Sequence, residues 1–506
     1  LADRVEAQAK TVQAIRQAHN EGAFARSGIA DWTTPPAPAS EAPFVPPRAQ
    51  RFRLANGISV LLIENHALPI VSMTLTAAGA GAAADPPGQG GLAAFTADLL
   101  DEGVSGESAL AIAGEEARLG ADIEIEVGPD AAEVSVDTLT STLDGTLDLL
   151  TRIVTQPTFN MREAERVKGD LETSLALRRD RPREVASIVL NGALFGPDTP
   201  YGHPIAGVLD EFSQLGASDA RAFYRQHWTP ASMTLVVAGD VDAHRLQGAL
   251  QNALGAWRPN RFVLPLTAAG LSPPPAAAAV VPPAAVPIAP IARLHLVDRP
   301  EAAQTDLRVG LVGPERRDPR FFAFDVLRTV LGDGFTSRLV QRLREQLGIT
   351  YAASADMQWR NSGGPFVIAT AIDTPETARG VSEILKLVDA LATSDVPSAE
   401  LEKSKESMIR ALPAEFETNE NTVDAFAELV QLGLPDDFYA HYADGVRAVT
   451  AADVKSAAKT LLPSGRLVFS LVGDLKKVRG AIDRLKLGAA QLYDPAGKPI
   501  EVSKAR

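Results

Sequence analysis

The chain has 506 residues, of which 45% are hydrophobic and 22% charged, and its formal net charge at pH 7 is −14. One hydrophobic core does not extend over so long a chain, so about two to four domains are predicted. The acidic balance, without any Lys/Arg-rich block, argues against a nucleic-acid-binding protein. The chain has no cysteine, which excludes disulfides, thiolate metal sites and thiol nucleophiles. No strongly apolar run reaches the roughly 18 residues that predict a membrane span.

Residues 1–47 are predicted to be an accessory segment. Within residues 1–24, apolar side chains recur at helical spacing at Val5, Ala9, Val12 and Ile15. This spacing predicts a short amphipathic helix, and a proline-rich tether follows it as far as Pro47. We interpret Leu1, in place of Met, as the mark of a removed secretory signal peptide. We therefore expect a periplasmic protein, and a shortened cytoplasmic chain is the alternative.

From residue 52 onward the pattern is that of mixed strands and helices. Residues 54–63 predict a β-hairpin that turns at Asn56-Gly57. Further strands are predicted at 70–76, 122–127, 133–139 and 233–240. Helices are predicted at 92–101, 108–119, 143–155, 161–179 and 185–194.

Two passages of the first half recur in the second half. Leu467–Asp474 repeats Met233–Asp240, and Glu400–Lys405 repeats Glu163–Lys168. The two matches lie at nearly the same offset along the chain, which indicates an internal duplication.

We therefore predict an α+β fold with two homologous domains, each an antiparallel-rich sheet covered by helices. The predicted domains are residues 48–265 and 292–490, joined by a Pro/Ala linker at 266–291. Residues 1–47 form the N-terminal extension and 491–506 the tail.

The first half also carries three passages in a fixed order. They are the Leu54-x-Asn56-Gly57 hairpin, then Leu68–Val71, then Gly91-Leu92-Ala93 after a Gly-rich loop. With the two repeats and the linker, they resemble the insulinase (pitrilysin-like, M16) family of zinc peptidases over most of the chain, from Phe52 to Tyr493. In active members Gly-Leu-Ala opens a helix with the motif H-x-x-E-H. Its two histidines bind zinc, and its Glu activates the metal-bound water.

Here the zinc motif is degenerate. Ala94 replaces the first His, Ala97 the catalytic Glu and Asp98 the second His. The family's third ligand, a Glu in the helix predicted at 161–179, corresponds to Glu172 or to Ser174. None of the seven histidines has H-x-x-x-H or H-x-x-E-H spacing. We expect this chain to bind no zinc and to cleave no peptide alone, because alanine offers neither a lone pair nor a proton.

The second half keeps a different signature of the family. Arg344 and Tyr351 match the pattern L-R-E-x-x-G-x-x-Y. The resemblance implies that this pair reaches the zinc site and donates hydrogen bonds to the substrate carbonyl and the developing oxyanion. Without the family resemblance, the alternative interpretation is that Arg344 belongs to a solvated helix face and that Tyr351 is a core residue of a strand. Gly332, Asp333 and Gly334 stand where silent subunits of the family carry a substrate-binding glycine-rich loop.

The resemblance implies a non-catalytic subunit of a heterodimeric zinc metallopeptidase that cleaves peptides or unfolded polypeptides. The expected partner is a homologous subunit with an intact H-x-x-E-H motif, which holds the zinc. The alternatives are a proteolytically silent scaffold and a peptide-binding protein of the same fold, which adds the peptide to a sheet edge.

Overall fold

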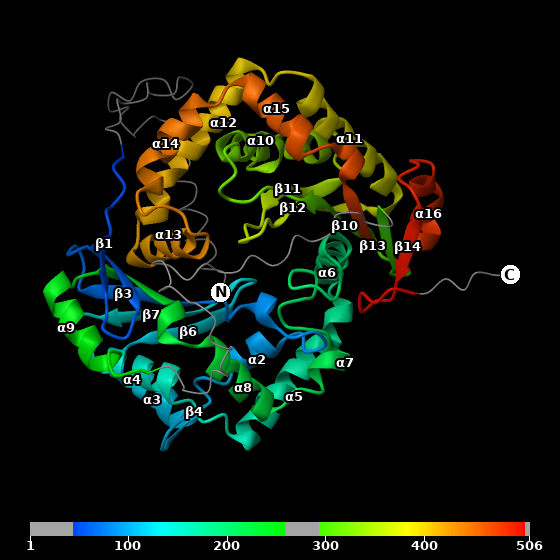
Figure 1. Ribbon diagram of the computed structural model, residues 1–506. Coiled ribbons are helices and arrows are strands. Elements are labelled where there is room, and N and C mark those ends of the chain that lie inside the picture. The colour runs from blue at the N-terminus through cyan, green and yellow to red at the C-terminus, as the bar shows by residue number, and fades with distance from the viewer. Residues whose placement is uncertain (1–43, 259–292, 501–506) are drawn as a thin grey trace, which may run out of the picture. The chain divides into compact units, whose positions relative to one another are not determined.

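The structure, a computed structural model, describes residues 44–258 and 293–500 (Figure 1). Pro46–Arg506 form one compact unit, and of the other unit, Leu1–Val45, only Phe44 and Val45 are described. The predicted N-terminal helix and the Pro/Ala linker therefore lie outside the described residues.

The first sheet has six strands in the order β1-β2-β8-β3-β7-β6. The only parallel neighbours among them are β2 and β8. The strands are β1 (Gln50–Arg53), β2 (Ser59–Glu64), β3 (Ile70–Ala78), β6 (Asp122–Val127), β7 (Ala131–Leu139) and β8 (Met233–Gly239). The predicted hairpin is present as β1 and β2, which turn at Asn56-Gly57, where Gly57 has a φ of 104°.

The second sheet repeats this order, as β14-β9-β13-β10-β12-β11. Its strands are β9 (Leu294–Asp298), β10 (Gln304–Val312), β11 (Thr350–Met357), β12 (Pro365–Asp373), β13 (Val468–Gly473) and β14 (Ala490–Tyr493). Strands β10 and β12 begin at one and the same offset from their counterparts β3 and β7. Both sheets lie within the predicted domain ranges, except that β14 crosses the predicted boundary at 490 and ends at Tyr493.

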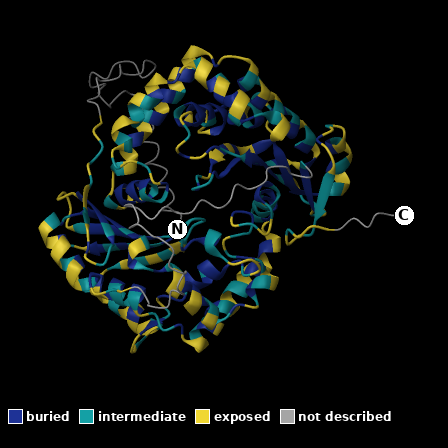
Figure 2. Ribbon diagram, viewed as in Figure 1, coloured by how far each residue is buried: buried dark blue, intermediate teal, exposed yellow. Residues whose placement is uncertain are grey.

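Helices cover the core face of each sheet, and their outer sides are exposed (Figure 2). The first half has α2 (Leu92–Ala97), α3 (Ala109–Leu119), α4 (Leu143–Thr155), α5 (Met161–Leu177), α6 (Pro182–Phe195), α7 (Leu209–Phe212), α8 (Ala217–His227) and α9 (Ala243–Ala253). The second half has α10 (Phe321–Gly332), α11 (Thr377–Thr393), α12 (Ser398–Ala411), α13 (Asn419–Gln431), α14 (Phe438–Ala448), α15 (Ala451–Leu461) and α16 (Leu475–Asp483). The predicted α+β class is confirmed. No helix of the described ranges is both long and apolar enough to cross a membrane.

The two halves exchange one helix each across their sheets. Helix α13 of the second half packs on β3 and β8 of the first sheet, and α6 of the first half packs on β10 and β13 of the second (Figure 1). The two helices are themselves counterparts, because the start of α13 at Asn419 follows the start of α6 at Pro182 by nearly the offset that relates the strands. Each sheet therefore buries its outer face with a helix from the other half.

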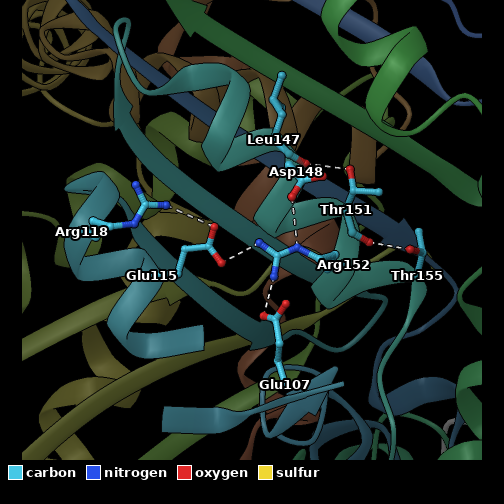
Figure 3. A network of polar contacts seen from close by, with 8 residues as sticks. All are labelled: Glu107, Glu115, Arg118, Leu147, Asp148, Thr151, Arg152 and Thr155. Carbon is cyan, nitrogen blue, oxygen red and sulfur yellow. Dashed lines mark hydrogen bonds and ion pairs between the residues drawn. The ribbon is translucent and has the colours of Figure 1, made fainter. Parts of the chain in front are cut away.

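A polar network ties the helices below the first sheet to one another (Figure 3). Arg152 of α4 donates to Glu107 of the small hairpin β4–β5 (Gly103–Val104 and Glu107–Ser108) at 2.5 Å. It also donates to Glu115 of α3 at 2.7 Å and to Asp148, one turn earlier in α4, at 3.1 Å. Its side chain is only 16% exposed, so three elements share one half-buried cation.

Candidate functional site

The helix that carries the zinc motif in active peptidases corresponds here to α2. Gly91 precedes it with a φ of 94°, and a Cβ there would lie 2.8 Å from the carbonyl oxygen of Ala206. The buried carboxylate of Asp85 caps the helix, since it accepts hydrogen bonds from the backbone N–H groups of Gly91 and Ala93, both at 2.7 Å. His203 lies 3.2 Å from the same carboxylate and 2.9 Å from the carbonyl of Thr199. This histidine supports the loop and the cap.

Helix α2 is shorter than predicted. The prediction of a helix to residue 101 is wrong, because the N–H groups of Leu99 and Leu100 bond three residues back, to Thr96 and Ala97, and so close a tight turn. Ala97 is 1% exposed, and Asp98 is the C-terminal cap of the helix. At the three motif positions the structure thus holds two methyl groups and one carboxylate.

A cavity of about 320 Å³ opens beside Asp98, lined mainly by charged side chains from the end of α2 and from α5. The charged lining residues are Asp98, Asp101, Glu102, Arg166 and Asp170. Burial, with the nearby carboxylates of Asp101 and Glu102, raises the pKa of Asp98 to about 6. Arg166 forms an ion pair with Glu102.

The two candidates for the third-ligand position, Glu172 and Ser174, lie on different faces of α5. Arg166 and Asp170 of α5 both line the cavity, and Ser174 follows Asp170 by four residues, on the same helix face. Glu172 follows by only two residues and therefore faces the other side of α5. The cavity therefore lies on the Ser174 side of α5, and the choice between Ser174 and Glu172 as the third-ligand position stays a prediction. Beside the Asp98 carboxylate, Ser174 would add one hydroxyl or Glu172 a second carboxylate. Neither set contains an imidazole, so neither fits a peptidase zinc site. Among the described residues, no group of three or more side chains is placed to hold a metal.

The structure brings Arg344 and Tyr351 together. Arg344 lies in a π-helical segment, Val340–Gln346, and Tyr351 is the second residue of β11, an edge strand. The guanidinium carbon lies 5.1 Å from the centroid of the Tyr351 ring. The reading of Tyr351 as a strand core residue is wrong, because this residue is 80% exposed.

The segment between the two residues is well fixed. Gly348 has a φ of 63° and donates its N–H to the carbonyl of Arg344 at 3.0 Å, and Ile349 donates to Leu343 at 3.0 Å. The pairing of β11 with β12 is irregular between Thr350 and Ala353, where a bulge interrupts the register. A bulge re-aims the side chain beside it, which explains why Tyr351 points to solvent.

The predicted loop residues lie next to this pair. Gly332 ends α10 against β11, since a Cβ there would lie 2.2 Å from the N of Ala355. Gly334 has a φ of 74°, and the Asp333 carboxylate lies 3.6 Å from a guanidinium nitrogen of Arg328. Asp333 is thus engaged by the chain itself.

Phe335 belongs to the same cluster, although sequence reasoning did not single it out. Its ring centroid lies 5.4 Å from the guanidinium carbon of Arg344, and the residue is 74% exposed. Its position directly after Asp333-Gly334 is the only signal that the sequence offers. Arg344 therefore lies near two exposed aromatic rings, those of Phe335 and Tyr351.

Two family models match consecutive parts of the chain. Residues 59–205 match the insulinase family (peptidase family M16), and residues 214–408 match the peptidase M16 inactive domain. The chain belongs to the M16 family. The predicted family membership is confirmed.

Relatives in the M16 family bear differing descriptions. An uncharacterized zinc protease of Mycobacterium tuberculosis is 26% identical over 382 residues, which are 74% of this chain and 81% of that protein. The non-peptidase homolog YmxG of Helicobacter pylori is 21% identical over 422 residues, 83% of this chain and 93% of that protein.

Solved structures of low identity share the M16 fold. One is the peptidase M16 inactive domain from Pseudomonas fluorescens, with a TM-score of 0.75 and 23% identity, covering 84% of this chain and 97% of that one. Another is a protease from Helicobacter pylori, with a TM-score of 0.74 and 16% identity, covering 85% and 100%. With Ala94, Ala97 and Asp98 in place of the zinc motif, this chain is a non-catalytic M16 member.

Proposed function

We propose that this chain is the non-catalytic subunit of a heterodimeric zinc peptidase. It lends Arg344 and Tyr351 to the zinc site of an M16 partner that carries an intact H-x-x-E-H motif. The substrates are peptides or unfolded polypeptides. The observation that carries the proposal is the exposed pair itself, in which the Arg344 guanidinium carbon lies 5.1 Å from the ring of an 80% exposed Tyr351.

The chemistry of the pair supports this role. A guanidinium and a phenol are strong hydrogen-bond donors, and donors held in place stabilise an oxyanion without a cost of reorganisation. The short turn through Gly348 and its backbone bonds hold both side chains. The fold itself has little use for the pair, because the only ion pair of Arg344 among the described residues is to its neighbour Glu345, at 3.4 Å.

The test is activity of the assembled complex. The chain is produced together with an M16 homologue of the same genome that carries H-x-x-E-H, and the complex is isolated by size-exclusion chromatography. Peptide hydrolysis should require both chains, and zinc should be found at one per heterodimer. Arg344→Ala or Tyr351→Phe should lower kcat by about ten- to a thousand-fold, the range for loss of one oxyanion donor.

The matched control for Arg344→Ala is Arg379→Ala. Arg379 of α11 is 54% exposed, and its one ion pair within the described ranges is to Glu376, a helical turn away. Arg342 is a poor control, although it is close in sequence, because it donates to the nearly buried Glu383 at 2.8 Å. Full activity of both variant complexes would reject the donor role and favour the silent scaffold. Binding of unfolded peptides by this chain, together with no active complex between it and any homologue that carries H-x-x-E-H, would favour the peptide-binding protein.

A further inference from the structure

A second cavity, of about 160 Å³, lies between α6 and the outer face of the second sheet. Six polar side chains line it, namely those of Ser187, Asn191, Arg308, Ser354, Asp356 and Gln358. It is separate from the cavity at Asp98, with which it shares no residue. At about 30 Å³ for each water, its volume equals roughly five water molecules, enough for a carboxylate and a short aliphatic stem.

Arg308 of β10 is the charged group of this cavity, and the residue is only 6% exposed. It donates through Nε to the Ser187 hydroxyl at 3.2 Å, and through its two Nη atoms to the backbone carbonyls of Leu307 and Arg183 at 3.0 and 3.4 Å. A guanidinium has five N–H groups, so these three bonds leave two N–H groups free. No carboxylate of a described residue lies within 4.0 Å of its nitrogens.

Asp306, two residues earlier on the same face of β10, is the acidic neighbour of Arg308, but no ion pair within 4.0 Å joins them. A buried charge without a closer counter-ion is costly. Burial lowers the pKa of Arg308, yet an arginine keeps its charge at neutral pH. The first half of the chain has Thr74 at the equivalent place of β3, opposite Ser135 as Arg308 is opposite Ala369. Thr74 is satisfied by a 3.0 Å hydrogen bond to Ser135. The same strand position is therefore built without a charge in the other copy of the fold.

Other polar side chains of the cavity also have hydrogen-bonding groups that no described residue occupies. The side chains of Asn191, Ser354 and Gln358 make no hydrogen bond to any other described residue. Asp356, the acidic lining residue, is 69% exposed and lies 3.7 Å from Arg328. Ser354 and Gln358 are exposed, so the cavity combines one buried cation with polar side chains at an open rim that can hydrogen-bond an entering anion.

We propose that this cavity binds a carboxylate of a peptide, either an Asp or Glu side chain or the C-terminal carboxylate. Ser354 at its wall follows Tyr351 by three residues of β11, which places the pocket about 10 Å along the strand from that ring. A peptide that reaches the Arg344/Tyr351 pair would therefore present the carboxylate about three residues away. The substrates of the proposed peptidase are then peptides that carry a carboxylate at this place. This link between the pocket and cleavage rests on the proposed function.

The experiment measures peptide binding to this chain alone, without a partner and without zinc. Fluorescein-labelled peptides of one Ala/Leu sequence carry either Glu or Gln at one position, and a free or an amidated C-terminus. Anisotropy titrations at neutral pH should show at least about ten-fold tighter binding for a peptide with a carboxylate than for the uncharged peptide, as expected for charge-assisted hydrogen bonds to a buried guanidinium. Tighter binding of the Glu peptide than of the Gln peptide identifies a side-chain carboxylate as the ligand. Tighter binding of the peptide with a free C-terminus than of the amidated one identifies the C-terminal carboxylate.

Two variants locate the effect. Arg308→Gln removes the cation, with Arg379→Gln as the matched surface change, and Ala369→Leu fills the cavity while leaving Arg308 intact. Both should abolish the preference for the carboxylate, whereas Arg379→Gln should keep it. If Arg308→Gln fails to fold, as judged by its thermal melt, Ala369→Leu decides alone.

Equal binding of the charged and uncharged peptides by the unaltered chain would overturn the proposal. A preference that survives Ala369→Leu would overturn it too, because the carboxylate would then lie outside the cavity. The binding result is separable from the proposed function, since it needs neither Arg344 nor an active partner.

Discussion

Asp98 stands at a position where its charge is disfavoured. Its pKa is raised to about 6 by burial and by the carboxylates of Asp101 and Glu102, from an ordinary value of 3.8. The folded state therefore holds the proton more tightly than the unfolded chain. The protonated carboxyl of Asp98 therefore contributes to the free energy of unfolding. This contribution is fully present below about pH 4 and is lost as the pH rises to about 6.

Asp98→Asn should accordingly stabilise the protein at pH 7, by about 1–3 kcal/mol in the free energy of unfolding, and should do nothing at pH 4. Urea unfolding between pH 4 and 8 measures this. The control is Asp389→Asn, on the exposed face of α11. It should leave the free energy of unfolding unchanged at both pH 4 and pH 8. A variant no more stable than the natural chain at pH 7 would show that the Asp98 charge is well solvated.

Phe335 is predicted to act on turnover of the complex rather than on folding. Its ring is largely exposed and lies 5.4 Å from the guanidinium carbon of Arg344. An exposed cation–π contact is worth about 0.5–1 kcal/mol, so Phe335→Ala should lower the kcat of the heterodimer about two- to five-fold. The thermal midpoint should stay unchanged, and Phe335→Tyr should restore turnover. A lower midpoint with unchanged kcat would make Phe335 a structural residue.

At the scale of elements, Arg152 joins α3, α4 and the β4–β5 hairpin (Figure 3). Arg152→Ala would leave three carboxylates facing each other without their cation. We expect a loss of about 2–4 kcal/mol in the free energy of unfolding, measured in urea. Arg118→Ala is the control, because Arg118 is 68% exposed and its ion pair with Glu115 is long, at 3.4 Å. Arg118→Ala should lower the free energy of unfolding by less than about 0.5 kcal/mol. Equal effects of the two changes would mean that the network adds nothing to a surface pair.

Most elements were predictable because their signals are local. Asn56-Gly57 places the first hairpin, and the predicted ranges of α4 and β6, 143–155 and 122–127, are found unchanged. The early end of α2 was not predictable, since Leu99 and Leu100 are apolar at positions that suit a continuing helix.

The candidate site was predictable only in part. The spacing of Arg344 and Tyr351 is in the sequence, but the exposure of Tyr351 depends on a bulge in β11. The pocket of Arg308 is assembled from Ser187, Arg308 and Ser354, which are far apart along the chain, so no local pattern reveals it.

At the scale of the whole chain, the exchanged helices make each half dependent on the other. Phe426 of α13 is 1% exposed and packs with Leu61 and Val236 of the first sheet. Phe426→Ala should cost about 3–5 kcal/mol, and the two halves should still unfold in one transition. Urea unfolding followed by fluorescence and by far-ultraviolet circular dichroism tests this, with Phe335→Ala as the surface control. Two separate transitions in the unaltered chain would show that the halves are independent.

The exchange of helices also affects folding during synthesis, because α13 is made long after the first sheet that it covers. When residue 258 has been made, the outer face of the first sheet, with Leu61, Ile63, Val236 and Ala238, still lacks the helix that covers it. That helix is complete only when Gln431 has been added. At roughly 5–20 residues per second, the apolar face stays uncovered for about 9–35 s. The nascent first half is therefore a natural client for a chaperone, until the second half emerges from the ribosome.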